Sequence, residues 1–288
     1  MTVSFMRVAT YIIGILVSLC GNVYATDRSI LQAENELGIG TGLTHLGYGE
    51  TLPGFPGYFD VENGELNTTV LNWSGLLDED DNRLVFLGMH VPPGTYLAGN
   101  LQYLTGAPAY DGHFQDGTPA SGTNLSTFFR LNLAAGFSKT LTRNLVLIPM
   151  FDFGYHYWKR TIQPNFIING VNFENNETYS HYNVGLGAQL DWKMMEGEVF
   201  AVGLDILENV NSTMYSDMTG DTYTLGNSIT YRLKGKLTFE PIKNVNLFGS
   251  VIAESFSYGA SPIQADQTLE PDSKTTLVFY TVGVAYAY

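Results

Sequence analysis

The chain ends on the stretch Thr281-Val282-Gly283-Val284-Ala285-Tyr286-Ala287-Tyr288. Large and small side chains alternate in this stretch, and the alternation begins at residue 278. One face carries Val278, Tyr280, Val282, Val284, Tyr286 and Tyr288, and the other carries Phe279, Thr281, Gly283, Ala285 and Ala287. Successive side chains of a strand point to opposite faces. A strand with one large apolar face, one small face and an aromatic end is typical of a barrel wall that faces lipid.

The same two-residue alternation recurs along the rest of the chain. Further segments show it at residues 37–44, 83–91, 95–103, 125–139, 145–157, 179–192, 200–206, 223–239 and 245–258. With the terminal strand this makes about ten, and an even number returns both chain ends to one side of a membrane. We therefore predict an all-β fold, a transmembrane antiparallel up-and-down β-barrel of about ten strands. If the hairpin 83–103, which turns at Pro92-Pro93-Gly94, belongs to a long loop, the barrel has eight strands.

The N-terminus has the composition of an export signal. Arg7 is followed by an apolar run from Val8 to Leu19 and then by a small-residue exit that ends at Ala25. This order is typical of a secretory signal peptide. The apolar run is also shorter than the ~20 residues that a transmembrane helix needs.

We expect cleavage after Ala25, which divides the chain into a signal peptide at 1–25 and a barrel domain at 26–288. Lipidation at Cys20 is an alternative, which the bulky Leu19 before it disfavours. Cleavage after Ala25 removes Cys20, the single cysteine, so we expect a mature protein without disulfides.

Composition limits the class of protein. Hydrophobic residues make up 44% of the chain and charged residues only 15%, against roughly 25% in an average soluble domain. No other stretch approaches the length of a transmembrane helix. The net charge of −14 argues against nucleic acid as a partner, because nucleic-acid binding needs a positive surface.

The connections between the predicted strands alternate between short and long. The short ones are 240–244, 193–197, 140–143 and 92–94, and the long ones are 259–274, 209–221, 158–178, 104–123 and 49–82. Bacterial barrels have short periplasmic turns and long external loops, so we place the long segments outside the cell. The alternative is a soluble β-sandwich or lipocalin-like barrel, which would have a well charged outside.

Charged residues of both signs fall on the predicted inward faces of the strands. They are Arg130, Asp152, His156, His181, Asp191, Asp205, Arg232, Lys234, Lys236 and Glu254. Charges withdrawn from water must be paired or hydrogen-bonded, and barrels of eight to ten strands are largely filled by side chains. We therefore predict an internal charge network that plugs the lumen. Arg232, Lys234 and Lys236 on one strand leave an anion path as an alternative.

The predicted external loops are strongly acidic. Segment 49–82 contains no Lys or Arg, and its acidic residues are Glu50, Asp60, Glu62, Glu65 and Asp78 to Asp81. The other long loops carry Asp111, Asp116, Glu174, Glu177, Asp217, Asp221, Asp266, Glu270 and Asp272 against Lys159, Arg160 and Lys274. One interpretation is a solvated surface that resists aggregation. The other is bridging by Ca²⁺ or Mg²⁺ to lipopolysaccharide phosphates, although the run at 78–81 lacks the spacing of an EF-hand loop.

Aromatic residues gather near the predicted strand ends. They are Tyr155, Tyr157, Trp158, Tyr179, Tyr182, Trp192, Tyr223, Phe239, Tyr286 and Tyr288. Aromatic rings with polar tips settle at the membrane–water boundary. We therefore predict two interfacial girdles.

The sequence offers little for catalysis. Asp111-Gly112-His113 is the nearest approach to a rim protease site, and no aspartate pair accompanies it at a comparable strand end. A hydrolase set needs a nucleophile beside its base. His156 with Asp152 could contribute to one, but Ser180 and His181 point to opposite faces. We therefore expect no enzyme activity, no catalytic residue, no cofactor and no metal site.

Two stretches resemble known outer-membrane proteins. The last eight residues resemble the C-terminal assembly signal of bacterial outer-membrane β-barrels, with key positions Thr281, Gly283, Tyr286 and Tyr288. Ile148 to Arg160, with its partner 177–186, looks like a strand pair of small barrels in the porin-like or OmpA-like superfamily. The resemblance implies the outer membrane of a Gram-negative bacterium. It also implies the barrel assembly machinery and periplasmic chaperones as partners, with membrane lipid and lipopolysaccharide around the folded barrel.

Fold alone carries no function, because such barrels host adhesins, channels and enzymes alike. We expect a plugged barrel with a role in envelope integrity or surface interaction, through a surface ligand that the sequence does not identify. One alternative is a narrow porin-like channel for small solutes. The other is a lipid- or peptide-modifying enzyme with its residues at the outer rim.

Overall fold

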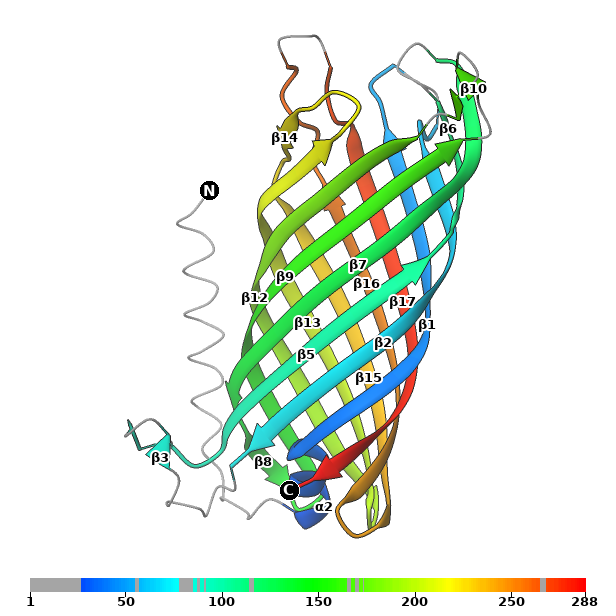
Figure 1. Ribbon diagram of the computed structural model, residues 1–288. Coiled ribbons are helices and arrows are strands. Elements are labelled where there is room, and N and C mark those ends of the chain that lie inside the picture. Colours follow the sequence, from blue (N-terminus) through cyan, green and yellow to red (C-terminus); the bar gives the residue numbers. More distant parts are fainter. Residues whose placement is uncertain are drawn as a thin grey trace.

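The computed structural model is a closed, tilted barrel (Figure 1). It describes residues 27–54, 57–77, 85–86, 89–90, 92–113, 117–164, 167–168, 171–172, 174–264 and 268–288. The predicted signal peptide at 1–25 lies outside these residues. Within the described part of the chain, no helix is both long enough and apolar enough to cross a lipid bilayer.

Ten antiparallel strands form the wall, which confirms the predicted fold class. They are β1 (Glu36–Thr51), β2 (Val61–Leu76), β5 (Thr95–Gly106), β7 (Pro119–Phe137), β9 (Leu145–Pro164), β12 (Asn175–Met195), β13 (Glu198–Ser216), β15 (Ser228–Ile242), β16 (Val245–Tyr258) and β17 (Asp272–Ala287). Each pairs with the next, and β17 pairs with β1 from Thr51↔Asp272 to Glu36↔Ala287. This last pairing closes the barrel and leaves no free sheet edge.

The outward face of the wall is large and apolar. On β1, Leu37, Ile39 and Leu43 are at least half exposed, and Tyr280 and Val282 on β17 are exposed as well. The inward neighbours of these residues are buried or small. A soluble protein would not present so continuous an apolar belt to water, so the belt has the character of a lipid-facing surface.

The second strand was predicted in the wrong place. Residues 61–76, which the sequence interpretation assigned to an external loop, form β2. The segment 83–91 contributes no barrel strand: β3 (Val85–Phe86) and β4 (Met89–His90) pair only with each other, and the rest of it lies outside the described residues. The outward face of β2 reads Asn63, Glu65, Asn67, Thr69. Because the outward face of this half-strand is polar, apolar alternation did not reveal it.

The strands also run further into the predicted loops than expected. β9 and β12 pair as far as Ile162↔Asn175, and β13 continues to Ser216. Short strands prolong the wall there: β6 (Ala109–His113) pairs with β7 and β2, and β14 (Thr222–Thr224) pairs with β13. We call this end of the barrel, which also carries β10 (Ile167–Ile168) and β11 (Val171–Asn172), the loop end (Figure 1).

The opposite end, here called the terminal end, holds α2 (Arg28–Glu34), β8 (Lys139–Thr142) and the C-terminus (Figure 1). Asp27 caps α2, because its Oδ1 accepts a hydrogen bond from Ser29 N at 2.8 Å. Ile30 and Ala33 pack against buried wall residues at this end, including Val146 and Ile148. The helix, which the sequence did not predict, therefore fills the terminal mouth of the barrel.

Candidate functional site: the closed lumen

The first layer of the lumen is an ion-pair layer, made of Arg130, Asp205, Arg232, Lys234 and Glu254. Glu254 accepts hydrogen bonds from Arg130 and from Arg232, the latter at 2.6 Å. Asp205 Oδ1 lies 2.8 Å from Lys234 Nζ, and its Oδ2 lies 3.5 Å from Arg232 Nη1. Arg130 extends from β7, whereas the other residues belong to β13, β15 and β16. These strands lie on the opposite side of the barrel, so the network crosses the lumen.

Two more of the predicted residues lie nearer the terminal end, in a separate group. Lys236 Nζ lies 2.7 Å from Glu36 Oε1. Asp191 accepts a hydrogen bond from Gln189 at 2.8 Å, and Gln189 also donates to Glu34 of α2 at 3.2 Å. The sequence interpretation missed Glu34 and Glu36. Glu36 could have been found from its position on the inward face of β1, two residues before Gly38.

These contacts count against the alternative of an anion path. Arg232, Lys234 and Lys236 are bonded to Asp205, Glu254 and Glu36. A cation that already neutralises a buried carboxylate has little attraction left for a passing anion.

His156 and His181 belong to an aromatic layer instead of the ion-pair network. Their ring centroids lie 4.7 Å apart, and Phe256 lies within 5.6 Å of both rings. His181 Nδ1 is 2.8 Å from the Tyr258 hydroxyl. No hydrogen-bond partner for either ring nitrogen of His156 occurs in the described chain.

The aromatic layer continues across the lumen as a series of stacked rings. Phe128 of β7 stacks on Trp158 of β9 at 4.8 Å, and Trp158 stacks on Tyr179 of β12 at 5.2 Å. Tyr179 in turn stacks on Tyr258 of β16 at 5.4 Å. All four side chains are almost completely buried. Their rings connect opposite walls and occupy the middle of the barrel.

The predicted girdle is therefore wrong at three positions. Trp158, Tyr179 and Tyr223 point inward and are buried. By contrast, Tyr286 on β17 and Tyr288, one residue beyond the end of β17, both belong to the predicted assembly signal and are exposed. Of the other two signal positions, Thr281 is buried and its hydroxyl lies 2.5 Å from that of Ser250.

A third layer, the Arg160 cluster, lies toward the loop end. The guanidinium of Arg160 bonds Glu62, Glu50 at 3.1 Å and Glu177 at 2.9 Å. It also lies 4.4 Å from the ring centre of Tyr48. The sequence interpretation assigned these charged residues to loops in water. β1, β9 and β12 extend beyond their predicted ends, and Glu62 lies on the unpredicted β2, so strand alternation turns the four charged side chains inward.

Two further carboxyls border the Arg160 cluster from connections outside the strands. Asp60 accepts hydrogen bonds from Tyr110 at 3.1 Å and from His113 N at 2.9 Å. Burial, with the carboxylate of Glu50 nearby, raises the pKa of Asp60 to about 8. Burial likewise holds the pKa of Glu270 well above its usual range. Near neutral pH the Asp60 carboxyl therefore carries a proton, which limits the negative charge around Arg160.

At the terminal end, Glu34 is the carboxyl that α2 turns into the lumen. Burial is the main reason that its pKa rises to about 6, and the charge of Lys236 offsets part of the rise. Other bonds attach the neighbouring chain to the rim: Lys193 Nζ lies 3.0 Å from Asp27 Oδ2, and Tyr288 N donates to Asn35 O at 3.0 Å. The helix is thus held by both polar and apolar contacts.

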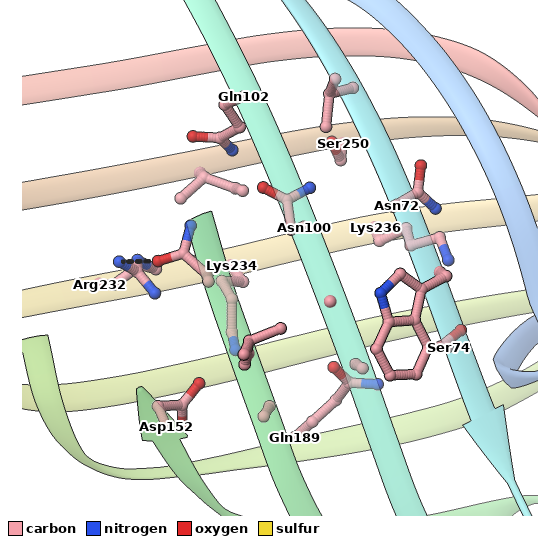
Figure 2. Close-up of a pocket in the computed structure, with 18 of the residues that line it drawn as sticks. Asn72, Ser74, Asn100, Gln102, Asp152, Gln189, Arg232, Lys234, Lys236 and Ser250 are labelled. Atoms are coloured by element: carbon pink, nitrogen blue, oxygen red, sulfur yellow. Dashed lines mark hydrogen bonds between the residues drawn. The ribbon is translucent and has the colours of Figure 1, made fainter. Parts of the chain in front are cut away.

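A cavity of about 200 Å³ lies between the ion-pair layer and α2. Its polar lining includes Asn72, Asn100, Asp152, Gln189 and Lys234 (Figure 2). Asp152, the last of the predicted lumen residues, faces this cavity, and its Oδ2 has no hydrogen-bond partner among the described residues.

Catalytic and metal-binding sets are not evident in the described residues. No group of three or more His, Cys, Asp or Glu side chains there is placed to hold a metal ion, so the described carboxylates give no support to the divalent-cation interpretation. The run at 78–81 lies outside the described residues. His113 Nδ1 is 2.9 Å from the Phe59 carbonyl oxygen, and His156 is packed among aromatic rings.

No protein-family model matches this chain, and neither does any curated protein. Among solved structures, the translocator domain of the autotransporter NalP from Neisseria meningitidis is similar at 12% identity, covering 90% of this chain and 94% of that chain with a TM-score of 0.40. The beta domain of the Bordetella autotransporter BrkA has 11% identity, coverage of 88% and 100%, and a TM-score of 0.38. A mutant of the TodX monoaromatic hydrocarbon channel has 9% identity, coverage of 91% and 93%, and a TM-score of 0.35. Likenesses this remote carry no argument about what the chain does.

Proposed function

We propose that this protein is a bacterial outer-membrane β-barrel that does not conduct solutes and that supports envelope integrity or surface interaction. The closure of the lumen at successive levels carries this proposal. From the loop end inward, the Arg160 cluster, the aromatic layer and the ion-pair layer each connect opposite walls. At the terminal end α2 fills the mouth.

The location in the outer membrane rests on the apolar belt and on the fold. Only helices and closed barrels can span a bilayer, because every backbone polar group must be bonded internally. We assign the terminal end to the periplasm and the loop end to the cell surface, as in other bacterial barrels. Lipid and lipopolysaccharide are then the immediate surroundings, and the loop end is the surface available to a ligand.

Planar-bilayer recording tests the closed lumen. The mature protein, refolded in detergent and added to a lipid bilayer, is expected to give no stable unitary current steps. Flotation with lipid vesicles and a folded band on unboiled gels establish that the protein has inserted. Reproducible unitary steps from inserted protein would refute the proposal and favour the narrow porin-like channel.

The cellular role is tested by deleting the gene. We expect the deletion strain to become more sensitive to detergent and EDTA, or to lose a measurable surface interaction, and the intact gene to restore it. A variant that replaces the exposed carboxylates Asp217 and Asp221 with asparagine separates the two roles. It should keep envelope resistance and lose only contacts made by the loop end. A deletion strain that matches its parent in both respects would contradict the proposed role.

A further inference from the structure

The apolar belt of the barrel is interrupted at β2. On β17, the outward side chains from Val278 to Tyr286 are all apolar or aromatic. On β2, the outward residues Trp73 and Leu71 are followed toward the loop end by polar ones. These are Thr69, Asn67, Glu65 and Asn63, and all four are exposed. The outer surface of β2 therefore differs from the lipid-facing surface of β17.

Part of this polar surface lies at the depth of the hydrocarbon core. A tilted strand crosses the core in roughly nine to eleven residues. Trp73 lies at the terminal edge of the belt on β2, as aromatic rings at a membrane interface do. Counted from Trp73, the crossing extends to about residues 63–65. Thr69 and Asn67 therefore fall inside the core, and Glu65 lies near its edge.

The neighbouring strands β1 and β5 extend the polar surface. In the strand register, Thr41 pairs with Thr69, and Asn67 pairs with Thr105. His45 pairs with Glu65, and its Nδ1 lies 2.9 Å from Glu65 Oε1. Both of these side chains are exposed, at 42% and 55%. We call this surface the polar wall patch, and it consists of Thr41, His45, Glu65, Asn67, Thr69 and Thr105.

Lipid cannot satisfy the polar wall patch. Hydrocarbon offers no hydrogen-bonding group, and a polar side chain placed there without a partner is costly. Thr41 Oγ1 donates to the Thr68 carbonyl oxygen at 3.1 Å, and His45 bonds Glu65. For Asn67, at the centre of the patch, no side-chain hydrogen bond occurs within the described part of the chain. A partner that brings its own polar groups to this depth would supply the missing bonds.

A second copy of this chain meets that requirement. Two copies in one membrane have the same orientation, so a two-fold axis along the membrane normal brings identical patches together at equal depth. An amide both donates and accepts, so Asn67 can bond the same residue of the second copy. His45 and Glu65 are complementary to each other, so a patch that carries both is complementary to itself. A phosphate-bearing headgroup matches less well, because the patch contains Glu65 and neither Lys nor Arg.

We infer that the polar wall patch is an interface through which two copies of this barrel associate side by side in the membrane. Association would cover the one part of the wall where β1, β2 and β5 present polar side chains to lipid. The inference rests on the membrane location proposed above and is independent of whether the lumen conducts.

Cysteine cross-linking tests the interface on an otherwise unaltered surface. Cys20 is the single cysteine, so the chain without residues 1–25 has none. Leu43→Cys places a thiol beside Asn67 on β1, at a position that is 50% exposed. Leu204→Cys is the matched control, because Leu204 is 51% exposed and lies on β13, across the barrel from β2 (Figure 1).

Each variant is refolded into phospholipid vesicles at a low protein-to-lipid ratio and oxidised with copper phenanthroline. We expect Leu43→Cys to give a band at twice the monomer mass and Leu204→Cys to remain monomeric. Equal dimer yields from the two variants would overturn the inference, and so would the absence of a dimer from both. Flotation with the vesicles and a folded band on unboiled gels establish insertion, so a wrong membrane location is recognised separately.

Substitutions then assign the interface to the polar residues. Asn67→Leu and Thr69→Val are introduced together into Leu43→Cys, and both new side chains suit a lipid-facing surface. We expect the dimer yield to fall about tenfold while the folded band is kept. An unchanged dimer yield would show that the polar side chains do not hold the interface and would overturn the inference. If this variant does not fold, the comparison of Leu43→Cys with Leu204→Cys still decides it.

Discussion

Replacing Arg160 with methionine removes the cation that bonds Glu50, Glu62 and Glu177. Methionine occupies similar space in the stack on Tyr48 but donates no hydrogen bond. The carboxylates are left buried without a counter-charge, and Glu62 has no exposed surface at all. Breaking a buried ion pair from one side costs roughly 3–5 kcal/mol. The expected loss of unfolding free energy is large compared with the ~5–15 kcal/mol of a typical folded domain.

The loss should depend on pH. Burial raises the pKa of Glu62 and raises that of Glu177 to about 7. When these two carboxyls are protonated, they no longer need the guanidinium charge, so acid conditions should reduce the difference in stability between Arg160→Met and the unaltered protein. We expect the full destabilisation at pH 9 and a clearly smaller one at pH 5. The measurement is urea unfolding of the refolded protein in detergent, followed by tryptophan fluorescence at both pH values.

The control is Lys159→Met, one residue away on the exposed outer face. Since it removes the same kind of charge from solvent, it should change the unfolding free energy by no more than about 0.5 kcal/mol. Equal destabilisation by the two substitutions would refute the reasoning, because the buried contacts of Arg160 would then have no special weight. A loss that is the same at pH 5 and pH 9 would also refute it.

Three further predictions concern closure, titration and the helix. Gly42→Val should prevent assembly, because an added Cβ would overlap the Tyr280 carbonyl oxygen where β1 meets β17. Gly47→Val is the control and should assemble normally, because nothing lies within 4 Å of its added Cβ. The folded band on unboiled gels distinguishes the two variants. Asp60 has a folded-state pKa of about 8, above its unfolded value, so its contribution to stability is complete at acid pH and is lost as the pH rises through about 8. Asp60→Asn should therefore lose less stability than the unaltered protein between pH 5 and pH 9, and an identical loss in urea unfolding would contradict the assignment. Ile30→Asp places a charge at a fully buried position of α2 and should release the helix, which would appear as faster protease cleavage near the N-terminus of the mature chain; an unchanged cleavage rate would show that the helix does not depend on this contact.

Several features of the wall could be predicted from single segments. Segments such as 179–192 and 278–288 show their lipid-facing and lumen-facing sides directly, because side chains of a strand alternate whatever their partners are. β2 could not be found in this way. Its outward residues from Asn63 to Thr69 are polar, and it is held in the wall by pairing with β1 and β5. The local sequence pattern does not reveal a strand that forms because it pairs with its neighbours.

The lumen shows the same division. Inward orientation of Arg130 and Glu254 follows from alternation, but the bond between them joins residues 124 positions apart in the sequence. The partners of Arg160 could not be predicted from alternation either, because they lie on three other strands and in parts of the wall outside the predicted strands.

The sequence by itself therefore determined that the chain forms an antiparallel barrel with an apolar outside and a charged inside, because alternation is a local property of each strand. Only the tertiary structure decided which charges meet, that α2 enters the terminal mouth, and that Asp152 faces a cavity. These outcomes depend on strand number, register and closure, which bring together side chains that no local pattern connects.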